Sequence, residues 1–190
     1  MTALLDITDT AIPAVKLLKP RRFSDARGFF AETWNARRMA AAGLDADFVQ
    51  DNLSLSNAVG TLRGLHYQAP PRAQGKLVSC LRGAIRDVAV DVRRGSPSYG
   101  RWVGADLSFD NGAHLWIPPG FLHGFVTRLP DTVVVYKCTD FYDPPSDGAV
   151  RWDSCGIDWG LSGPAVLSDK DAVAPAFADW VTPFDAGAAA

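Results

Sequence analysis

Fourteen residues of the chain hold three side chains suited to an anionic, carbonyl-bearing substrate, namely Arg63, His66 and Lys76. A base that removes a proton beside a carbonyl works best with a pKa of about 7, and the enolate that it forms needs fixed positive charge nearby. Together the three side chains therefore suit proton abstraction. Taken alone, an isolated histidine is more often structural, and an isolated arginine or lysine is usually a solvated surface charge.

The segments around these residues predict a strand over Thr61–Gln68, a Pro-Pro turn and a second strand that begins at Lys76. The period of two in a strand places His66 on one face and Arg63 on the other. A bulge at Gly64 would return Arg63 to the face of His66.

Short strands separated by Gly, Pro, Asn and Asp turns fill the middle of the chain. Many strands of similar length without alternating helices favour a closed antiparallel barrel or a jelly roll over a parallel sheet. In the strand that begins at Ala84, valines alternate with Asp87, Ala89 and Asp91, so one face must be core. The predicted strands are Phe48–Leu55, Thr61–Gln68, Lys76–Arg82, Ala84–Arg93, Trp102–Phe109, His114–Ile117, Gly124–Leu129 and Thr132–Thr139.

The first fifty residues are predicted to hold less regular structure. After a short leader, we expect an edge strand over Val15–Lys19, an arginine-rich loop over Pro20–Gly28 and a strand over Phe29–Trp34. A helix should follow over Ala36–Ala42, capped by Asn35 and ended by Gly43. Near the other end we expect a helix around Asp171–Trp180 and a loose tail over 185–190.

Length and composition indicate one domain over residues 1–190 with a substantial core. The chain is 47% hydrophobic and 21% charged, which is ordinary for a globular protein. Its formal charge of −2 does not indicate binding to nucleic acid or to a membrane surface. The acidic start, Met1 to Ile12, does not resemble a targeting signal, so we expect a cytoplasmic protein. Three cysteines without metal spacing, Cys80, Cys138 and Cys155, are expected to be free thiols.

A jelly roll with His66 on one strand and His123 after Pro118-Pro-Gly suggests the cupin pattern, which commonly builds a metal site. Here Gln68 replaces the second histidine of the first motif, and Lys76 lies where the acid would be. A cationic lysine would oppose a divalent ion and favour an anion. We therefore expect no metal and no other cofactor.

At these residues the sequence closely resembles the dTDP-4-dehydrorhamnose 3,5-epimerase family, nucleotide-sugar epimerases with a cupin fold. The resemblance runs in the family's order from about Arg27 to Asp171. The matching motifs are Asp25-Ala-Arg-Gly-Phe-Phe-Ala-Glu, Phe48-Val-Gln-Asp-Asn, Leu62-Arg-Gly-Leu-His-Tyr-Gln, Gln74-Gly-Lys-Leu-Val, Asp87-Val-Ala-Val-Asp-Val-Arg, Leu115-Trp-Ile-Pro-Pro-Gly-Phe-Leu-His-Gly-Phe, Tyr136-Lys-Cys-Thr-Asp-Phe-Tyr and Leu167-Ser-Asp-Lys-Asp.

The resemblance implies a mainly β, cupin-type antiparallel jelly-roll barrel with a few short helices. It also implies inversion of C3 and C5 of dTDP-4-dehydro-6-deoxy-D-glucose to give dTDP-4-dehydro-L-rhamnose. By analogy His66 is the base, Tyr136 the acid and Asp171 the carboxylate that orients His66. Lys76, helped by His123 and Arg63, is implied to stabilise the C4 enolate oxygen.

Family positions further imply a set of substrate contacts and a homodimer whose N-terminal strands exchange. Tyr142 matches the residue that stacks on the thymine ring, and the Arg27 loop is expected to reach a neighbouring subunit's site. Two residues depart from the family pattern: Ala26, where Glu is common, and Asp147, where a longer Glu is usual. The implied substrate contacts are Arg27, Glu32, Gln50, Asp51, Asn52, Arg63, His123, Tyr142, Asp147 and Lys170.

Other interpretations stay open at this point. Tyr136 on an apolar strand fits a core tyrosine, and Asp171 fits a helix cap. An epimerase acting at one carbon only and a non-catalytic sugar-nucleotide-binding cupin remain alternatives. A metal-dependent cupin oxygenase or isomerase is disfavoured by the single histidine of the first motif.

Overall fold

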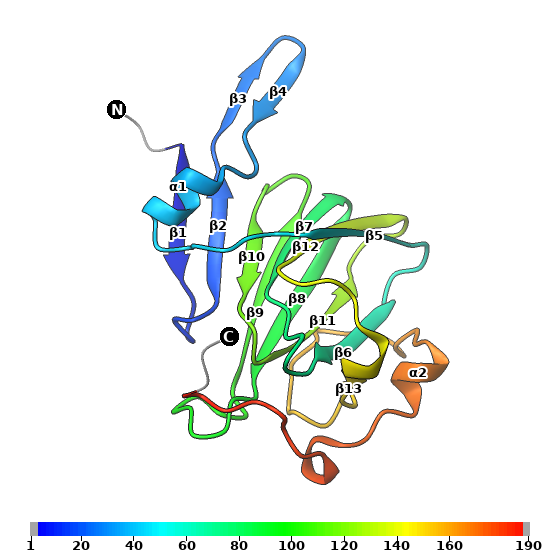
Figure 1. The fold of residues 1–190 in the computed structure, drawn as a ribbon. Helices are drawn as coiled ribbons and strands as arrows, with labels where there is room; N and C mark the ends of the chain where they lie inside the picture. The colour runs from blue at the N-terminus through cyan, green and yellow to red at the C-terminus, as the bar shows by residue number, and fades with distance from the viewer. Residues whose placement is uncertain (1–3, 188–190) are drawn as a thin grey trace.

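Two antiparallel sheets face each other in the computed structural model, which describes residues 4–187 (Figure 1). The first sheet has the order β1 (Leu5–Asp9), β2 (Lys16–Pro20), β10 (His114–Ile117), β7 (Lys76–Arg82), β12 (Thr132–Cys138) and β5 (Gln50–Ser56). The second has the order β13 (Asp147–Ala149), β6 (Leu62–Gln68), β11 (Phe121–Thr127), β8 (Ala84–Asp91) and β9 (Trp102–Ser108). This arrangement confirms the predicted mainly β, antiparallel jelly-roll class.

The main core lies between the two sheets. Val78 and Val134 from the first sheet meet Ile85, Ala89 and Phe125 from the second, and all are buried. Side chains alternate along each strand, so one residue in two faces this interior. The same alternation lets polar side chains enter the interior at one end, where the candidate site is built.

Two smaller clusters cover the outer faces of the sheets. Helix α1 (Ala36–Ala41) places Met39 against Leu18 and Leu77 on the outside of the first sheet. On the outside of the second sheet, Val88 and Val90 pack with Trp159 from the long C-terminal segment. Both faces of β8 are therefore buried, because the C-terminal segment covers the valine face. The same C-terminal segment also contains the one-turn helix α2 (Asp169–Ala172).

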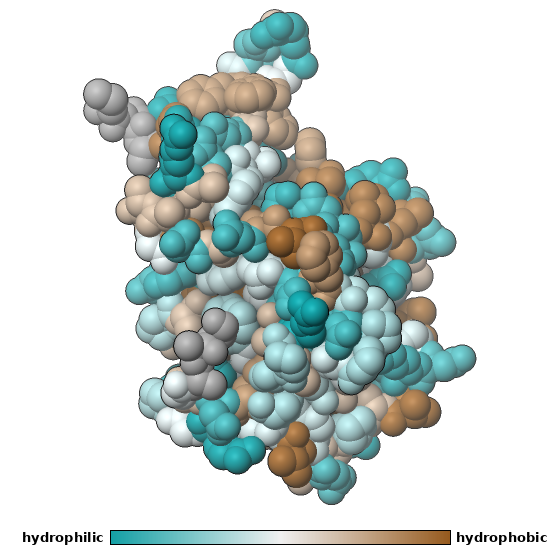
Figure 2. Space-filling model, viewed as in Figure 1, coloured by the Kyte–Doolittle hydropathy of each residue, from teal (hydrophilic) through white to brown (hydrophobic). Residues whose placement is uncertain are grey.

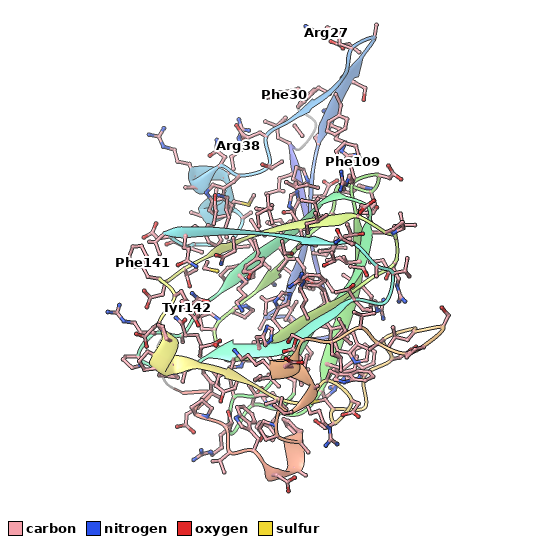
Figure 3. The ribbon with its side chains drawn as sticks, turned by 90° about the vertical axis from the view of Figure 1, so that its right-hand side faces the viewer. Arg27, Phe30, Arg38, Phe109, Phe141 and Tyr142 are labelled. Carbon is pink, nitrogen blue, oxygen red and sulfur yellow. The ribbon has the colours of Figure 1, made fainter. Side chains whose placement is uncertain are left out.

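A hairpin of β3 (Arg22–Asp25) and β4 (Gly28–Ala31) projects from the body of the molecule (Figure 1). Arg27 lies at its tip, and Phe30, 71% exposed, lies along it (Figure 3). Arg22 stacks on Phe29 at the base of the hairpin, and Phe29 contacts Phe109 of the body. Figure 2 shows hydrophobic side chains on the body below the hairpin and hydrophilic ones at its tip.

Several predicted bounds were wrong. The segment Pro20–Gly28 is not a loop but contains β3, and the leader contains β1, which takes the edge position predicted for Val15–Lys19. Strand β11 begins at Phe121, three residues before the predicted start, because the turn at Pro118-Pro-Gly ends sooner. The strand predicted over Phe29–Trp34 ends at Ala31.

The predicted C-terminal helix was also wrong, since that region holds only α2 and a 3₁₀ turn over Phe177–Asp179; another 3₁₀ turn covers Pro144–Ser146. Helix α1 begins after Asn35, whose side chain accepts from the Arg38 N–H, as expected. Of the tail predicted to be loose, residues 188–190 lie outside the described residues, and Asp185 forms a bridge with Arg94. All three cysteines are free. Within residues 4–187, every helix is too short or too polar to cross a membrane.

Candidate active site

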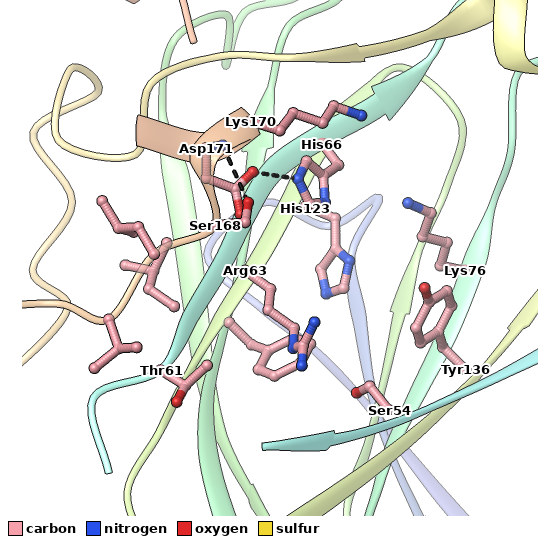
Figure 4. A pocket seen from close by; sticks show the side chains of 14 residues that line it. Ser54, Thr61, Arg63, His66, Lys76, His123, Tyr136, Ser168, Lys170 and Asp171 are labelled. Atoms are coloured by element: carbon pink, nitrogen blue, oxygen red, sulfur yellow. Dashed lines mark hydrogen bonds and ion pairs between the residues drawn. The ribbon is translucent and has the colours of Figure 1, made fainter. Parts of the chain in front are cut away.

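A cavity of about 370 Å³ opens between the two sheets at one end of the barrel (Figure 4). Its polar lining comes from strands of both sheets and from the segment that ends in α2. The side chains that line it are Ser54, Thr61, Leu62, Arg63, His66, Lys76, His123, Phe125, Tyr136, Val166, Leu167, Ser168, Lys170 and Asp171.

A bulge in β6 brings Arg63 and His66 into this one cavity. In the pairing with β11, His66 is opposite His123 and Arg63 is opposite Phe125, so β6 holds one more residue than its partner over this stretch. Gly64 has φ +120°, and a Cβ there would lie 2.6 Å from the His123 carbonyl oxygen. Only glycine fits this position. The predicted bulge at Gly64 is confirmed.

His66 and Asp171, 105 residues apart in sequence, form a tight pair. Nε2 of His66 lies 2.6 Å from Oδ1 of Asp171. The Asp171 side chain is almost fully buried, whereas a third of the His66 side chain is exposed towards the cavity. Since Nε2 is occupied by the carboxylate, Nδ1 is the nitrogen left to act on a ligand.

The environment of Asp171 keeps its carboxylate charged. Burial alone would raise its pKa, but hydrogen bonds donated by His66 and Ser168, together with the charge of His66, bring the pKa below its usual value. The N–H of Gly64 adds a further bond to Oδ2 at 3.4 Å. Ser168 caps α2 by accepting from the Asp171 N–H at 3.2 Å. A charged Asp171 accepts the Nε2 proton of His66, which leaves Nδ1 free to accept a proton.

Lys76 and Tyr136 come from neighbouring strands of the first sheet. The ammonium of Lys76 lies 5.9 Å from the ring centroid of Tyr136. Burial lowers the pKa of Lys76, although Cys138, Asp147 and Asp87 oppose the shift, and burial raises the pKa of Tyr136. The phenol is therefore protonated at neutral pH and is able to donate a proton.

His123 lines the same cavity and is paired with a carboxylate of its own, that of Asp87. Its Nε2 is 2.7 Å from Oδ1 of Asp87, and its ring centroid is 6.3 Å from that of Tyr136. Asp87 is fully buried, and its Oδ2 has no hydrogen-bond partner among the described residues. Burial raises the pKa of this carboxyl group, opposed by His123 and Lys76.

A second cavity of about 250 Å³ adjoins the first and shares His66, Lys76 and Tyr136 with it. Gln50, Asn52, Tyr142 and Asp147 are among the residues that complete its lining. An ion pair between Lys170, which lines the first cavity, and Asp147, which lines the second, joins the two. Asp147 therefore reaches a cationic partner despite being shorter than the usual Glu. Together the cavities form one elongated site.

Three glutamines fix the loop that carries Tyr142. Gln68 accepts from the Asp143 N–H at 2.9 Å and donates to the Phe141 carbonyl oxygen at 2.9 Å. Gln50 accepts from the Tyr142 N–H and Gln74 donates to the Asp140 carbonyl oxygen, both at 2.8 Å. Tyr142 itself is 57% exposed, so its ring stands free at the edge of the second cavity (Figure 3).

Three of the residues expected to contact substrate line neither cavity. Asp51 lies on the outer face of β5, where it pairs with Lys137 at 3.0 Å, because its parity is opposite to that of Gln50 and Asn52. Glu32 pairs with Arg38 of α1. Arg27 lies on the projecting hairpin and pairs with Asp25 at 2.5 Å. All the other expected site residues line one cavity or both.

Some residues of the site were not singled out from the sequence. Ser54 and Phe125 line the first cavity, Ser168 orders Asp171, and Gln74 holds the Tyr142 loop. The alternation of Gln50, Asn52 and Ser54 along one strand was the signal for Ser54. Groups of three or more His, Cys, Asp or Glu arranged to hold a metal ion do not occur within residues 4–187.

Comparisons with known proteins point to one family. A sequence model described as dTDP-4-dehydrorhamnose 3,5-epimerase matches residues 9–179. An enzyme of that name from Sinorhizobium fredii is 49% identical over 176 residues, which are 92% of this chain and 90% of the relative.

Two solved structures share the fold. One is a dTDP-6-deoxy-D-glucose-3,5-epimerase from Legionella pneumophila in complex with dTDP-4-keto-L-rhamnose, with 45% identity, a TM-score of 0.87 and coverage of 90% of this chain and 92% of that one. The other is a dTDP-4-dehydrorhamnose 3,5-epimerase from Bacillus anthracis with TDP and PPi bound, with 43% identity, a TM-score of 0.88 and coverage of 91% and 99%. By family match and by identity over most of its length, this chain belongs to the dTDP-4-dehydrorhamnose 3,5-epimerase family.

Proposed function

We propose that this isomerase inverts C3 and C5 of dTDP-4-dehydro-6-deoxy-D-glucose to give dTDP-4-dehydro-L-rhamnose. The observation that carries the proposal is the pairing of His66 with a buried, charged Asp171 across a cavity that also holds the protonated phenol of Tyr136. A base and an acid that reach one cavity from different strands are what inversion at a carbon requires. A module that only binds sugar nucleotides needs neither.

The proposed chemistry follows from the acidity of carbons beside a ketone. Nδ1 of His66 takes the proton from C3 or C5, and the C–H electron pair forms a double bond while the carbonyl electrons move to the C4 oxygen. Lys76, His123 and Arg63 supply the positive charge and donors for this oxygen, and one such donor is typically worth about 3 kcal/mol of barrier. Tyr136 then delivers a proton to the opposite face.

The nucleotide is proposed to occupy the second cavity. Tyr142 offers an exposed aromatic face for the thymine ring, on the loop that three glutamines hold. Asn52 and Gln50 offer amides, and Lys170 offers positive charge for the diphosphate. Tolerant stacking alone does not select thymine, so selectivity requires polar contacts to the ring edge.

One labelling experiment tests the activity and its extent. The enzyme is incubated with dTDP-4-dehydro-6-deoxy-D-glucose in deuterium oxide, and NMR reads label and configuration at C3 and C5. Label and inversion at both carbons are expected. Inversion at one carbon would assign a single-position epimerase, and absence of both label and inversion, with the nucleotide still bound, would assign a binding protein.

We further propose that the active form is a homodimer in which the hairpin of one subunit reaches the site of the other. The support is the apolar surface of the hairpin, with Phe29 and Phe30 exposed, and the position of Arg27 at its tip (Figure 3). Exposed Leu53 and Leu55 on β5 offer an apolar face for a partner. Light scattering should give a dimer, and a stable, fully active monomer would refute this proposal.

A further inference from the structure

Two His–Asp pairs border the same cavity, and their carboxylates differ in surroundings. Asp171 receives hydrogen bonds from His66 and from the Gly64 N–H. Asp87 has one partner, His123, and its second oxygen is buried without a donor among the described residues. Both imidazoles use Nε2 for the carboxylate, so both present Nδ1 to the ligand.

We propose that the His123–Asp87 pair holds one proton more than the His66–Asp171 pair, so that Nδ1 of His123 donates to the substrate's C4 oxygen while Nδ1 of His66 is bare. Asp87 is then a positioning residue that acts through His123. This inference rests on the proposed function, because it requires a ketone oxygen near Lys76 and His123.

Proton counting explains why one extra proton is sufficient. With two protons in the pair, either Asp87 is neutral and donates to Nε2, or Asp87 is charged and His123 carries both protons. Nδ1 bears a proton in both arrangements, and the pair is neutral overall, which suits complete burial. Removing one proton would leave a net negative charge on a carboxylate that lacks any second donor.

The surroundings of each pair support the difference. Lys76 faces Asp87 from β7, and the Cys80 thiol lies on the same strand. Burial raises the pKa of Asp87, and His123 and Lys76 oppose that rise. The Asp171 carboxylate accepts from the Gly64 N–H, and the Asp171 N–H donates to Ser168, the residue that caps α2. Tyr136, the nearest aromatic neighbour of His123 on β12, is protonated and brings no negative charge.

The reaction balances with these protons and with solvent, which takes the carbon-bound proton from His66 and returns a proton to the Tyr136 phenolate after each inversion. When Nδ1 of His66 takes the carbon-bound proton, the C4 oxygen gains the carbonyl electron pair and accepts the Nδ1 proton of His123. That transfer leaves the second pair with a single proton, shared between Nε2 and Asp87. When Tyr136 protonates the carbon, the oxygen returns its proton and the carbonyl forms again.

The same substitution at the two carboxylates tests the inference. An asparagine can donate to Nε2 and so keeps the proton of the histidine on Nδ1, the arrangement wanted at His123 and unwanted at His66. Asp87→Ala should lower kcat on the order of a hundred-fold, and Asp87→Asn should recover to within about ten-fold of wild type. Asp171→Asn should instead stay as impaired as Asp171→Ala, because a wrong tautomer costs on the order of 10⁴ in comparable pairs.

Equal loss in Asp87→Asn and Asp87→Ala, with dTDP affinity and thermal stability unchanged, would overturn the inference. If wild type neither exchanges nor inverts, the proposed function fails instead. Should the Asp87 variants not fold, ¹⁵N NMR of the wild-type imidazoles decides, because the chain has only three histidines and each can be assigned by replacing one at a time. A protonated Nδ1 on His123 and a bare one on His66 are expected; a bare Nδ1 on His123 would exclude the donor role.

Discussion

The floor and the rim of the site are built differently. The floor comprises His66, Lys76, His123 and Tyr136, which project from β6, β7, β11 and β12 and are held by the ladders of two sheets. The rim comprises Tyr142 on a loop, Asp147 at the start of the three-residue strand β13 and Lys170 on the one-turn helix α2. Tyr142 and Lys170 are exposed. The groups that must act within tenths of an ångström therefore lie on strands, whereas groups that hold a ligand's ends lie on segments able to adapt.

This difference predicts that floor substitutions act on turnover and rim substitutions on affinity. A floor residue that acts mainly through KM, or a rim residue that acts mainly through kcat, would contradict it. The expected loss of activity is largest for substitution of His66 and decreases through Tyr136 and Arg27 to Gln68.

His66→Ala should abolish inversion and solvent exchange together, because no carbon-bound proton leaves without the base. The expected loss is on the order of 10⁴ in kcat, the upper range for a general base. NMR in deuterium oxide measures both processes, and calorimetry with dTDP serves as the control for an intact binding site. Continued exchange at C3 or C5 would assign the base to another residue.

Tyr136→Phe should separate the two processes. The base and the oxyanion donors remain, so deuterium should still enter the sugar from the face of His66 while inversion falls on the order of a hundred-fold, most clearly at C5. Inversion at the wild-type rate would make Tyr136 a core residue. Joint loss of exchange and inversion, with normal fold and binding, would place it in the proton-abstraction apparatus.

Arg27→Ala should weaken substrate binding roughly ten-fold or more while thermal stability stays the same, because a phosphate contact is charge-assisted and an exposed arginine adds little to folding. Arg37→Ala, at an exposed arginine of α1, is the matched control and should change neither. Equal losses of affinity and stability would indicate a structural arginine at position 27.

Gln68→Ala should raise KM by roughly three- to ten-fold with a small change in kcat, because it releases the loop that presents Tyr142. Gln68→Glu keeps the acceptor for the Asp143 N–H and loses the donor to the Phe141 carbonyl, so an intermediate KM is expected. Steady-state kinetics and dTDP titration measure the effect. A fall in kcat at unchanged KM would show that Gln68 acts with the floor residues and not through the Tyr142 loop.

The strands were largely predictable because their signals are local. Strands β7 and β10 begin and end at the predicted residues, and β5, β6, β8, β9 and β12 differ by a residue or two at either end, where alternation and turn residues mark them. Strand β3 was not recognised, because an arginine-rich hairpin that leaves the body has little apolar alternation. Strand β11 lies near two glycines and two prolines, which made the turn look longer than it is.

The site was predictable only in part. The alternation of side chains along the strand, with a bulge at Gly64, was enough to predict Arg63 beside His66. No local pattern links His66 to a residue 105 positions away, so Asp171 was identified through the family resemblance alone. The partner of His123 was missed because Asp87 sits in a valine-rich strand, on the face that also gives Ile85 and Ala89 to the main core. The glutamine contacts to the Tyr142 loop come from β5, β6 and the segment before β7, and no sequence period reveals them.

The extra residue of β6 also determines how this fold can be altered. Since strand parity alternates, deleting Gly64 would restore an unbroken ladder and turn Arg63 away from the cavity, while also removing the Gly64 N–H that donates to Asp171. Deleting one codon would thus remove the positive charge beside the base while keeping Arg63 in the sequence. A substitution at Arg63 removes the same charge by replacing the residue. For laboratory evolution of cavities in such barrels, strand register is a variable to be sampled alongside amino-acid identity.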